Sequence, residues 1–437
     1  MTIVFAVPFF SLKIFRVFTG IFIAVPATIS SRDPMNCHCY AILWGVVFLA
    51  GLFMPAVSAV DPLWTQAAAP SGELSCIVIS ADGSTIVAGG DQLIAFSPDG
   101  KNLWNGWSGT YLAISSDGNY IVTSRGQTVR LITGTGTMLW DESLGVPVTD
   151  VDMTPDASFI AAAGGGRVRV INASGAGFRQ NSTIPVNHLR FIPPGDRIVI
   201  TTTEGIQTSN LTLISEWTDT NMAQDLVEVA RDGSSFVTVT NNRIRYYTRD
   251  GMMEWERALP GGNALAFAYS RDGSTIVIGR DDNTVQALDR NGTLLWTARA
   301  AYWITSVAVS DDGNTIAAGS MDKTLSLFDR AGTKLGSFTA REPIKAHSVA
   351  VSSDGSVIAA VDASAVYGFS RSQFTRPVTT AMPATTPPAT VTMPAIITPL
   401  TSPPPFTRPP TTIPEAVPLY IPLAGLVLLL VFRSRQL

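Results

Sequence analysis

Short hydrophobic runs alternate with turn signals along residues 60–374. The segments IVISADGSTIVAGG from Ile77 and VAVSDDGNTIAAGS from Val307 show the pattern: a run rich in β-branched residues, an Asp-Gly or Asn-Gly pair, and a second run. Two such runs separated by such a pair are typical of a β-hairpin, because glycine reaches the positive φ angles that tight turns require. The pattern therefore predicts an all-β region.

The hairpin pattern repeats. Tryptophan recurs with it, at Trp64, Trp104, Trp140, Trp217, Trp255 and Trp296. One missing copy near Phe178 gives a period of about 39 residues, and a unit of this length with four short strands is typical of a propeller blade. Eight units begin near Cys76, Leu112, Val151, Leu189, Val227, Ala266, Val307 and Val349. The sequence thus predicts an eight-bladed β-propeller of four-stranded antiparallel blades.

The ends of this region complement each other. The eighth unit ends near Phe369 without its Leu-Trp strand, whereas Leu63 and Trp64 stand alone before the first unit. We expect this first strand to complete the last blade, since closing the ring removes its exposed edges. The propeller is therefore predicted to span residues 60–374.

The repeated turns and strand ends resemble two propeller families. The SSDG-like and SPDG-like turns and the LFD strand ends resemble WD-repeat propellers, and the GxLLW strand ends and eight-unit count resemble PQQ-binding-like (quinoprotein-type) propellers. The chain lacks the glycine-histidine pair of WD repeats, and after residue 59 Cys76 is its only cysteine, so the adjacent cysteines of quinoprotein dehydrogenases are missing. The resemblance implies a fold but no particular activity, because propellers include both enzymes and scaffolds.

The N-terminal part, residues 1–59, is predicted to be an extension and a signal peptide. An apolar run over residues 40–55 precedes small residues suited to signal peptidase, which predicts cleavage after Ala59. Met35 stands just before the apolar run and is the expected true start. The alternative is an unusually long signal or an N-terminal membrane hairpin.

The C-terminal part is predicted to be a stalk followed by an anchor. Threonine and proline dominate residues 375–415, a composition that favours extended polyproline II structure and O-glycosylation, with a bare linker as the alternative. Residues 416–437 hold an apolar segment and a basic tail. Val417, Pro418 and Pro422 resemble the VPxxxP sorting signal of archaeal surface proteins, which implies lipid anchoring after cleavage; a retained transmembrane helix is the alternative.

Charge and composition narrow the possible partners. The formal net charge is −4 and no basic cluster occurs, which argues against nucleic acid. Three cysteines and three histidines leave little for a metal site or a disulfide framework. We expect no metal and no cofactor.

Residues that break the repeat are the best candidates for binding. The six repeated tryptophans are expected to act as wedges between blades. Trp107 and Trp303, the latter beside Tyr302, lie outside those positions, in connections that lead into inner strands and share one face. The turns between second and third strands should add a mixed-charge rim to that face, formed by Arg280, Asp281, Asp282, Asp322, Lys323 and Asp362. Four glycosylation sequons occur, at Asn172, Asn181, Asn210 and Asn291.

Together these features predict a binding module at the outer face of the cell membrane, directed at envelope or surface-layer proteins or at polysaccharide. No residue is assigned to catalysis. Cys76 is expected to be a buried thiol, and His188 and His347 to lie on opposite sides of the ring in structural roles. The alternatives are an extracytoplasmic hydrolase or lyase that uses acids facing the channel, and a passive structural component of the envelope. The oligomeric state is left open.

Overall fold

The computed structural model describes residues 13–17, 20–24, 59–68, 72–181, 184–220, 226–240, 242–259 and 261–374 of the 437-residue chain. Contacts divide the chain into two compact units, Met1–Val378 and Thr379–Leu437, and all described residues belong to the first. The predicted signal peptide, stalk and C-terminal sorting segment, with Val417, Pro418 and Pro422, lie outside the described residues and stay predictions. Among the described residues, no helix has the length and apolar character needed to cross a membrane.

The described residues form eight antiparallel sheets of four strands and one two-stranded sheet, which pairs β1 (Lys13–Val17) with β2 (Gly20–Ala24). Blades 1 to 4 consist of β4 (Leu74–Ile79), β5 (Ile86–Gly90), β6 (Leu93–Phe96) and β7 (Asn102–Gly106); β8 (Tyr111–Ile114), β9 (Tyr120–Arg125), β10 (Thr128–Thr133) and β11 (Met138–Ser143); β12 (Asp150–Met153), β13 (Phe159–Gly164), β14 (Arg167–Asn172) and β15 (Gly177–Asn181); and β16 (Val186–Ile192), β17 (Arg197–Thr202), β18 (Ile206–Asn210) and β19 (Ser215–Asp219).

Blades 5 to 8 follow the same order from the centre outward. They consist of β20 (Leu226–Val229), β21 (Ser235–Thr240), β22 (Arg243–Thr248) and β23 (Met253–Ala258); β24 (Ala264–Tyr269), β25 (Thr275–Arg280), β26 (Thr284–Asp289) and β27 (Leu294–Arg299); β28 (Ile304–Val309), β29 (Ile316–Ser320), β30 (Thr324–Phe328) and β31 (Lys334–Thr339); and β32 (Val349–Val351), β33 (Val357–Val361), β34 (Ala365–Ser370) and β3 (Trp64–Ala67). The short helix α2 (Arg371–Phe374) follows β34.

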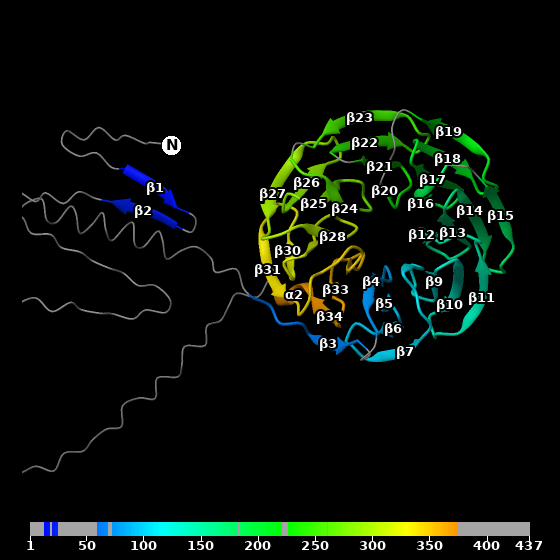
Figure 1. The fold of residues 1–437 in the computed structure, drawn as a ribbon, viewed down its shortest axis with the longest axis horizontal. Coiled ribbons are helices and arrows are strands. Elements are labelled where there is room, and N and C mark those ends of the chain that lie inside the picture. Colours follow the sequence, from blue (N-terminus) through cyan, green and yellow to red (C-terminus); the bar gives the residue numbers. More distant parts are fainter. Residues whose placement is uncertain are drawn as a thin grey trace, which may run out of the picture. The chain divides into compact units, whose positions relative to one another are not determined.

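The blades stand side by side in a closed ring, with the first strand of each blade nearest the centre (Figure 1). The strand β3 pairs with β34, with Trp64 opposite Gly368 and Ala67 opposite Ala365. The strand that comes first in the propeller therefore completes the last blade. The predicted eight-bladed architecture and its closure are both confirmed.

The burial of each strand explains the pattern of apolar and polar residues in its sequence. The middle strands are packed on both faces by neighbouring blades, and β5 and β25 are buried along their whole length. Strands in such surroundings are apolar at successive positions. Most outer strands expose half of their side chains or more, as β27 does, and this explains why polar Thr297 and Arg299 occur in Leu294–Arg299.

Six tryptophans on outer strands form contacts across six of the eight junctions between neighbouring blades. Each indole ring lies against the glycine of the turn between the third and fourth strands of the following blade, in the pairs Trp64–Gly100, Trp104–Gly136, Trp140–Gly175, Trp217–Gly251, Trp255–Gly292 and Trp296–Gly332. The ring N–H often donates to a carbonyl oxygen in the same turn, for example from Trp104 to Gly134 at 2.7 Å. The prediction that these tryptophans are wedges between blades is confirmed, and we call each pair a Trp–Gly clasp.

The junction between blades 3 and 4 departs from this rule. Phe178 stands on β15 where six other blades carry tryptophan. The turn of blade 4 that would receive the ring carries Leu213 instead of glycine, at a φ of 64°. Tryptophan and its glycine are therefore absent together at this junction.

The turns of the first hairpins are held by a hydroxyl and an aspartate. In blade 1, Ser80 Oγ donates to Asp82 Oδ1 at 2.6 Å and accepts from the N–H of Thr85 at 3.0 Å. Ala157 takes the place of glycine in the third of these turns, yet it adopts a φ of 58° and its N–H donates to Thr154 O as in the other turns.

Candidate functional site

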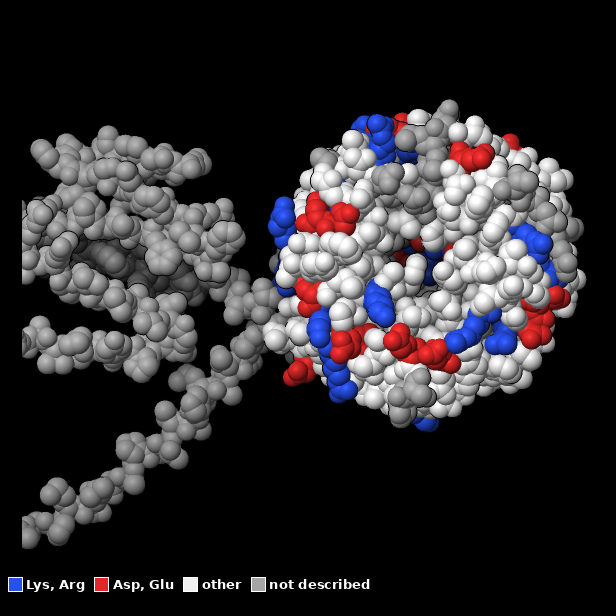
Figure 2. Space-filling model, in the orientation of Figure 1, with Lys and Arg blue, Asp and Glu red and all other residues white. Residues whose placement is uncertain are grey.

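The inner strands of the eight blades surround a central cavity of about 460 Å³. Figure 2 looks down into this hollow, where acidic and basic side chains are visible. One repeat position on the inner strand lines the cavity in every blade, namely Val78, Ala113, Asp152, Arg190, Glu228, Ala268, Ala308 and Ala350. This position is charged in blades 3, 4 and 5 and is alanine or valine in the other five.

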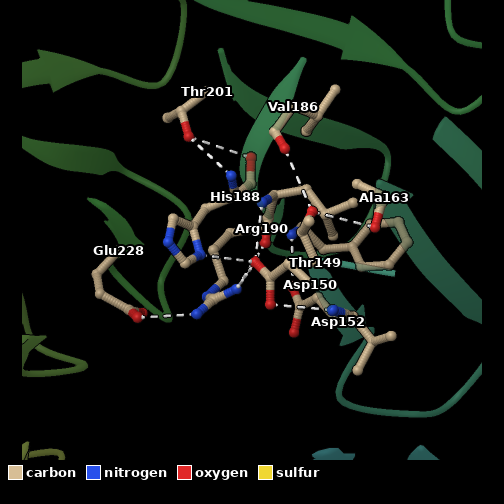
Figure 3. A network of polar contacts seen from close by, with 12 residues as sticks. Thr149, Asp150, Asp152, Ala163, Val186, His188, Arg190, Thr201 and Glu228 are labelled. Carbon is tan, nitrogen blue, oxygen red and sulfur yellow. Dashed lines mark hydrogen bonds and ion pairs between the residues drawn. The ribbon is translucent and has the colours of Figure 1, made fainter. Parts of the chain in front are cut away.

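The charged residues of blades 3 to 5 form one polar network (Figure 3). Arg190 lies between two carboxylates: its Nη1 is 2.8 Å from Asp150 Oδ2 and its Nη2 is 3.2 Å from Glu228 Oε1. His188 Nδ1 lies 3.2 Å from the same oxygen of Asp150, which also accepts the N–H of Leu189 at 3.0 Å. We call Asp150, Asp152, His188, Arg190 and Glu228 the charged wall.

The two aspartates of the charged wall are two residues apart on β12, yet their acidities differ widely. Burial opposes ionisation of both. At Asp150, Arg190 and His188 overcome it and hold the pKa at about 2. At Asp152, burial outweighs the attraction of Arg190 and the N–H bond from Phe191, and the charge of Asp150 adds to it, so the pKa is raised to about 6.

One end of the cavity is bridged by side chains from the turns that follow the inner strands. Arg231 of blade 5 donates to Ser353 Oγ of blade 8 at 2.7 Å and lies 3.3 Å from Asp311 of blade 7. Arg271 of blade 6 lies 3.3 Å from the other oxygen of Asp311. Backbone bonds from Asp311 to Ser353 and from Ser353 to Ala81 join the turns of neighbouring blades. We call this group of side chains the floor.

The two histidines after residue 59 both line the cavity. His188 belongs to the charged wall, and His347 lies in the connection before β32, where burial lowers its pKa and the charges of Asp150 and Arg190 also reach it. They come from different sides of the ring, as expected, but share one cavity, which sequence reasoning missed. Cys76 is buried, as expected, and burial raises its pKa to about 12, so it is an unreactive thiol.

The repeat-breaking aromatic residues occupy two separate places. Tyr302 and Trp303 stack on each other with ring centroids 5.1 Å apart and remain 47% and 42% exposed. Trp107 instead packs on blade 2: its ring N–H donates to Gly136 O at 3.1 Å, and the guanidinium of Arg130 lies 5.6 Å from the ring centroid. Blades 7, 8 and 1 separate the two places, so the structure does not bring Trp107 and Trp303 together.

The acidic turn residues near the aromatic pair fix the backbone. Asp322 Oδ2 accepts the N–H of Ala301 at 2.8 Å, which ties the turn between β29 and β30 to the connection that carries Tyr302 and Trp303. Asp281 and Asp282 make equivalent bonds to the connection before β24, with Asn263 and Gly262 at 2.7 and 3.1 Å. These turns and connections therefore share a face, as expected.

Two members of the expected rim are not at the surface. Arg280 is fully buried, and its guanidinium donates to Gly262 O and Leu259 O. Asp362 is 1% exposed and accepts the hydroxyl of Tyr367 at 2.8 Å. Both residues hold connections in place, and the prediction that they form part of an exposed rim was wrong.

Three of the four sequons lie in the same turn of the repeat, the one between the third and fourth strands. Asn172 and Asn210 end β14 and β18, and each side-chain oxygen accepts the N–H two residues on, at 3.0 Å. Asn291 is exposed in the corresponding turn of blade 6. Asn181 ends β15 and its side chain lies outside what the structure describes.

Sequence reasoning missed the charged wall. Asp152, Arg190 and Glu228 carry a signal that could have found them, because they are the charged members of a repeat position that is otherwise alanine or valine. Among the residues that the structure describes, no three His, Cys, Asp or Glu side chains come together as a group able to hold a metal ion.

Comparison with known proteins places the fold. The family model described as "WD domain, G-beta repeat" matches residues 292–329, which run from the outer strand of blade 6 through the third strand of blade 7. The solved structure of the C-terminal WD40 domain of Sif2 is 15% identical, with a TM-score of 0.61, over 71% of this chain and 99% of that one. Chaetomium thermophilum Sqt1, solved bound to the N-terminus of the ribosomal protein L10, is 13% identical, with a TM-score of 0.58, over 68% and 97%.

No curated protein matches the chain in sequence. Identities of this size show the fold alone, and the resemblance to PQQ-binding-like propellers stays a prediction. The matched repeat and the eight four-stranded blades together make this chain a WD-repeat-like β-propeller.

Proposed function

We propose that this chain is a protein-binding propeller displayed on the outside of the cell. Export is supported by the signal-like segment that ends at Ala59, and display by the Thr/Pro-rich residues 375–415. Anchoring is supported by the apolar C-terminal segment, with Val417, Pro418 and Pro422 placed as in an archaeal sorting signal. The partners are envelope or surface-layer proteins.

The observation that carries the binding role is the exposed, stacked pair Tyr302 and Trp303. Hydrogen bonds hold the backbone beneath the pair: Ser320 Oγ donates to Tyr302 O at 3.2 Å, and the N–H of Met321 donates to Trp303 O at 3.0 Å. Large aromatic side chains on a fixed backbone are typical anchors of protein interfaces, because binding then costs little ordering of the free protein.

The surroundings of the pair suit a protein partner. Asp322 accepts the N–H of Ala301 beside the pair. Asp281 and Asp282 bond to the equivalent connection of the neighbouring blade 6. These carboxylates on the same face supply the polar rim that interfaces commonly have. Trp107, far round the ring, presents a second, smaller aromatic contact. The solved structure of Sqt1, a propeller of similar fold, holds a protein segment, which supports the same kind of partner here.

The test is capture by the full tagged chain from the detergent-solubilised envelope of its own cells. We compare the native sequence with a Tyr302→Ala/Trp303→Ala variant and quantify bound proteins and glycans by mass spectrometry. A Leu294→Ala/Leu295→Ala variant is the control, since these residues are 52% and 44% exposed on the outer strand of blade 6. We expect specific proteins to fall at least fivefold with the aromatic variant only, a loss of about 1 kcal/mol.

Three results would overturn the proposal. They are capture of nothing specific, equal capture by all three chains, and enrichment of glycans in place of proteins. The last would assign the aromatic pair to polysaccharide, since aromatic rings also stack on sugars.

Export and anchoring are tested separately on the protein from cells. Terminal peptides identified by mass spectrometry should begin at Val60 and should lack the segment after Pro422. A chain that keeps residues 1–59 would contradict export by the predicted signal. A chain that begins at Val60 and keeps residues 423–437 would replace sorting with a transmembrane anchor.

An extracytoplasmic hydrolase or lyase is the second candidate, favoured by one observation. Two carboxylates on β12 have their pKa values held apart, at about 2 for Asp150 and about 6 for Asp152, and such a separation is what an acid and base pair requires. Turnover of envelope glycans or peptides by the full chain, lost in Asp152→Asn, would establish it. Unchanged turnover in that variant would remove it.

A further inference from the structure

The cavity is a cup, closed at one end. Arg231 reaches from blade 5 to Ser353 of blade 8, and Arg271 and Asp311 add bridges from blades 6 and 7. Side chains that span three or four blades leave no straight path through the ring at this end. A ligand must therefore enter from the other end. Within the charged wall, the side chains of Arg190 and Glu228 keep 21% and 32% of their surface exposed.

The cup has two chemically different sides. At the repeat position that lines it, blades 1, 2, 6, 7 and 8 contribute only alanine or valine, and Phe267 and Val309 lie beside them. Blades 3 to 5 contribute Asp152, Arg190 and Glu228. The small side chains on one side leave room for a ligand, and the charged side chains on the other side can bind its polar group. The volume of about 460 Å³ falls within the range of small-ligand sites.

The charged wall carries more negative than positive charge. Asp150, Asp152 and Glu228 face a single guanidinium, and Arg190 bonds to the first and third of these acids. In the part of the chain that the structure describes, Asp152 makes no ion pair; its Oδ2 accepts the N–H of Phe191. A carboxylate inside a cavity that makes no ion pair of its own attracts a cation from solution.

We propose that the cup binds an organic cation, an ammonium or guanidinium group on an apolar body, with the charge against Asp152 and Glu228 and the body against the alanine and valine side. The proposal rests on the proposed function only where a protein partner carries the cation. An organic cation fits better than a metal ion, because Arg190 already fills the space between Asp150 and Glu228 and the opposite side offers no oxygen ligand at this level.

The other titratable groups facing the cup do not compete with this role. Tyr111 and His347 line the cup on blade 2 and in the connection to blade 8; burial raises the pKa of Tyr111 and lowers that of His347, so both favour the neutral form. Arg231 and Arg271 share Asp311 at the floor. The raised pKa of Asp152, about 6, marks a carboxylate that gains most from a cation beside it.

The test is titration calorimetry of the full chain with n-hexylammonium, compared with n-hexanol and hexanoate. These ligands share one apolar body and differ in charge. We expect saturable binding of the cation alone. Its affinity should fall about tenfold between pH 7 and pH 5, because below pH 6 the cation competes with a proton on Asp152.

Two variants test the residues. Asp152→Asn should weaken binding of n-hexylammonium about tenfold or more, and Glu228→Gln serves if the first variant does not fold. The matched control is Asp99→Asn, which makes the same change of charge on an exposed outer turn and should leave the affinity unchanged. Equal affinities for all chains, or binding of hexanoate as tight as that of the cation, would overturn the proposal.

A second pair of ligands distinguishes the source of the cation. An acetylated, amidated tripeptide Ala-Lys-Ala is compared with the same peptide containing norleucine, which lacks the ammonium group. Tighter binding of the lysine peptide than of n-hexylammonium would point to a side chain of a partner, and the reverse to a free amine. Neither ligand needs the face that carries Tyr302 and Trp303. If no ligand binds the cup, the proposed protein-binding face is therefore unaffected, and if the capture experiment fails, the proposed cation site in the cup is unaffected.

Discussion

The periphery and the centre of this ring follow opposite rules. At the periphery, six tryptophans meet six turn glycines, from Trp64 with Gly100 to Trp296 with Gly332. At the centre, the corresponding position of the inner strand changes from alanine to aspartate, arginine and glutamate between neighbouring blades. The difference shows that residues which follow the repeat form the packed scaffold, whereas residues which depart from the repeat form the charged wall of the cavity.

The junction between blades 3 and 4, which lacks a Trp–Gly clasp, supports this division. Where Phe178 replaces tryptophan, Leu213 replaces the glycine of the next blade, and its side chain is buried among residues of blades 3 and 4. A buried side chain thus occupies the turn that in other blades must leave room for the indole. At the periphery, the tryptophan and the glycine of a clasp are replaced together. In the charged wall, each residue differs individually from those at the same position in other blades.

The contrast between periphery and centre is tested most strongly by removing a Trp–Gly clasp. Trp296→Ala should lower the free energy of unfolding by about 3 kcal/mol, because the ring packs on Phe328 and Gly332 and its N–H donates to Arg330 O at 3.0 Å. Urea unfolding followed by circular dichroism measures it. Trp303→Ala is the control, since Trp303 is 42% exposed, and should change stability by less than about 0.5 kcal/mol. Equal losses in the two variants would mean that the clasps do not hold the ring.

A second prediction concerns the centre of the ring, where the stability of the folded chain depends on pH through Asp152. The pKa of Asp152 is raised from its ordinary 3.8 to about 6 in the folded chain, so folding favours its protonated form. The stability that this provides is complete below pH 3.8 and is lost as the pH rises through 6. Asp152→Asn, which stays neutral, should therefore be more stable than the native chain by about 3 kcal/mol at pH 7.5.

The pH dependence separates this effect from a simple change of packing. Unfolding at pH 4 and pH 7.5 should show the advantage of Asp152→Asn at the higher pH and almost none at the lower. Asp150, with its pKa held at about 2 by Arg190 and His188 against the cost of burial, works in the opposite direction. Its contribution persists above pH 4 and is lost only near pH 2. An advantage of Asp152→Asn that is independent of pH would contradict the raised pKa.

The sequence was sufficient for the periphery because each feature occurs many times. Six tryptophans at one spacing and the Asp-Gly turns predicted the number of blades, the wedges and the closure by the strand of Trp64, all of which the structure confirms. Repetition reveals what each blade needs to pack on its neighbours. It does not reveal which surface of a blade faces a ligand.

The charged wall was not predicted, for a physical reason. Asp150, Arg190 and Glu228 lie up to 78 positions apart and meet only because three inner strands stand side by side in the closed ring. The pKa of Asp152 depends on burial, which no local pattern records. The same limit explains the wrong expectation for Arg280, whose charged group is satisfied by carbonyls of the connection at Leu259 and Gly262.

The smallest expected effect concerns the glycine of a clasp. It separates the cost of backbone strain at this glycine from the cost of a clash with the tryptophan ring. Gly332 and Gly126 both adopt positive φ angles, 84° and 59°, which strain any side chain. A Cβ at Gly332 would meet the ring of Trp296, whereas nothing lies within 4 Å of a Cβ at Gly126. Gly126→Ala should therefore cost about 1 kcal/mol from strain alone, and Gly332→Ala about 1 kcal/mol more than that. In the Trp296→Ala background the indole is gone, so the extra cost of Gly332→Ala should disappear while its strain remains. If the extra cost survives there, the glycine serves only its turn, and the pairing of tryptophan with glycine around the ring has another cause.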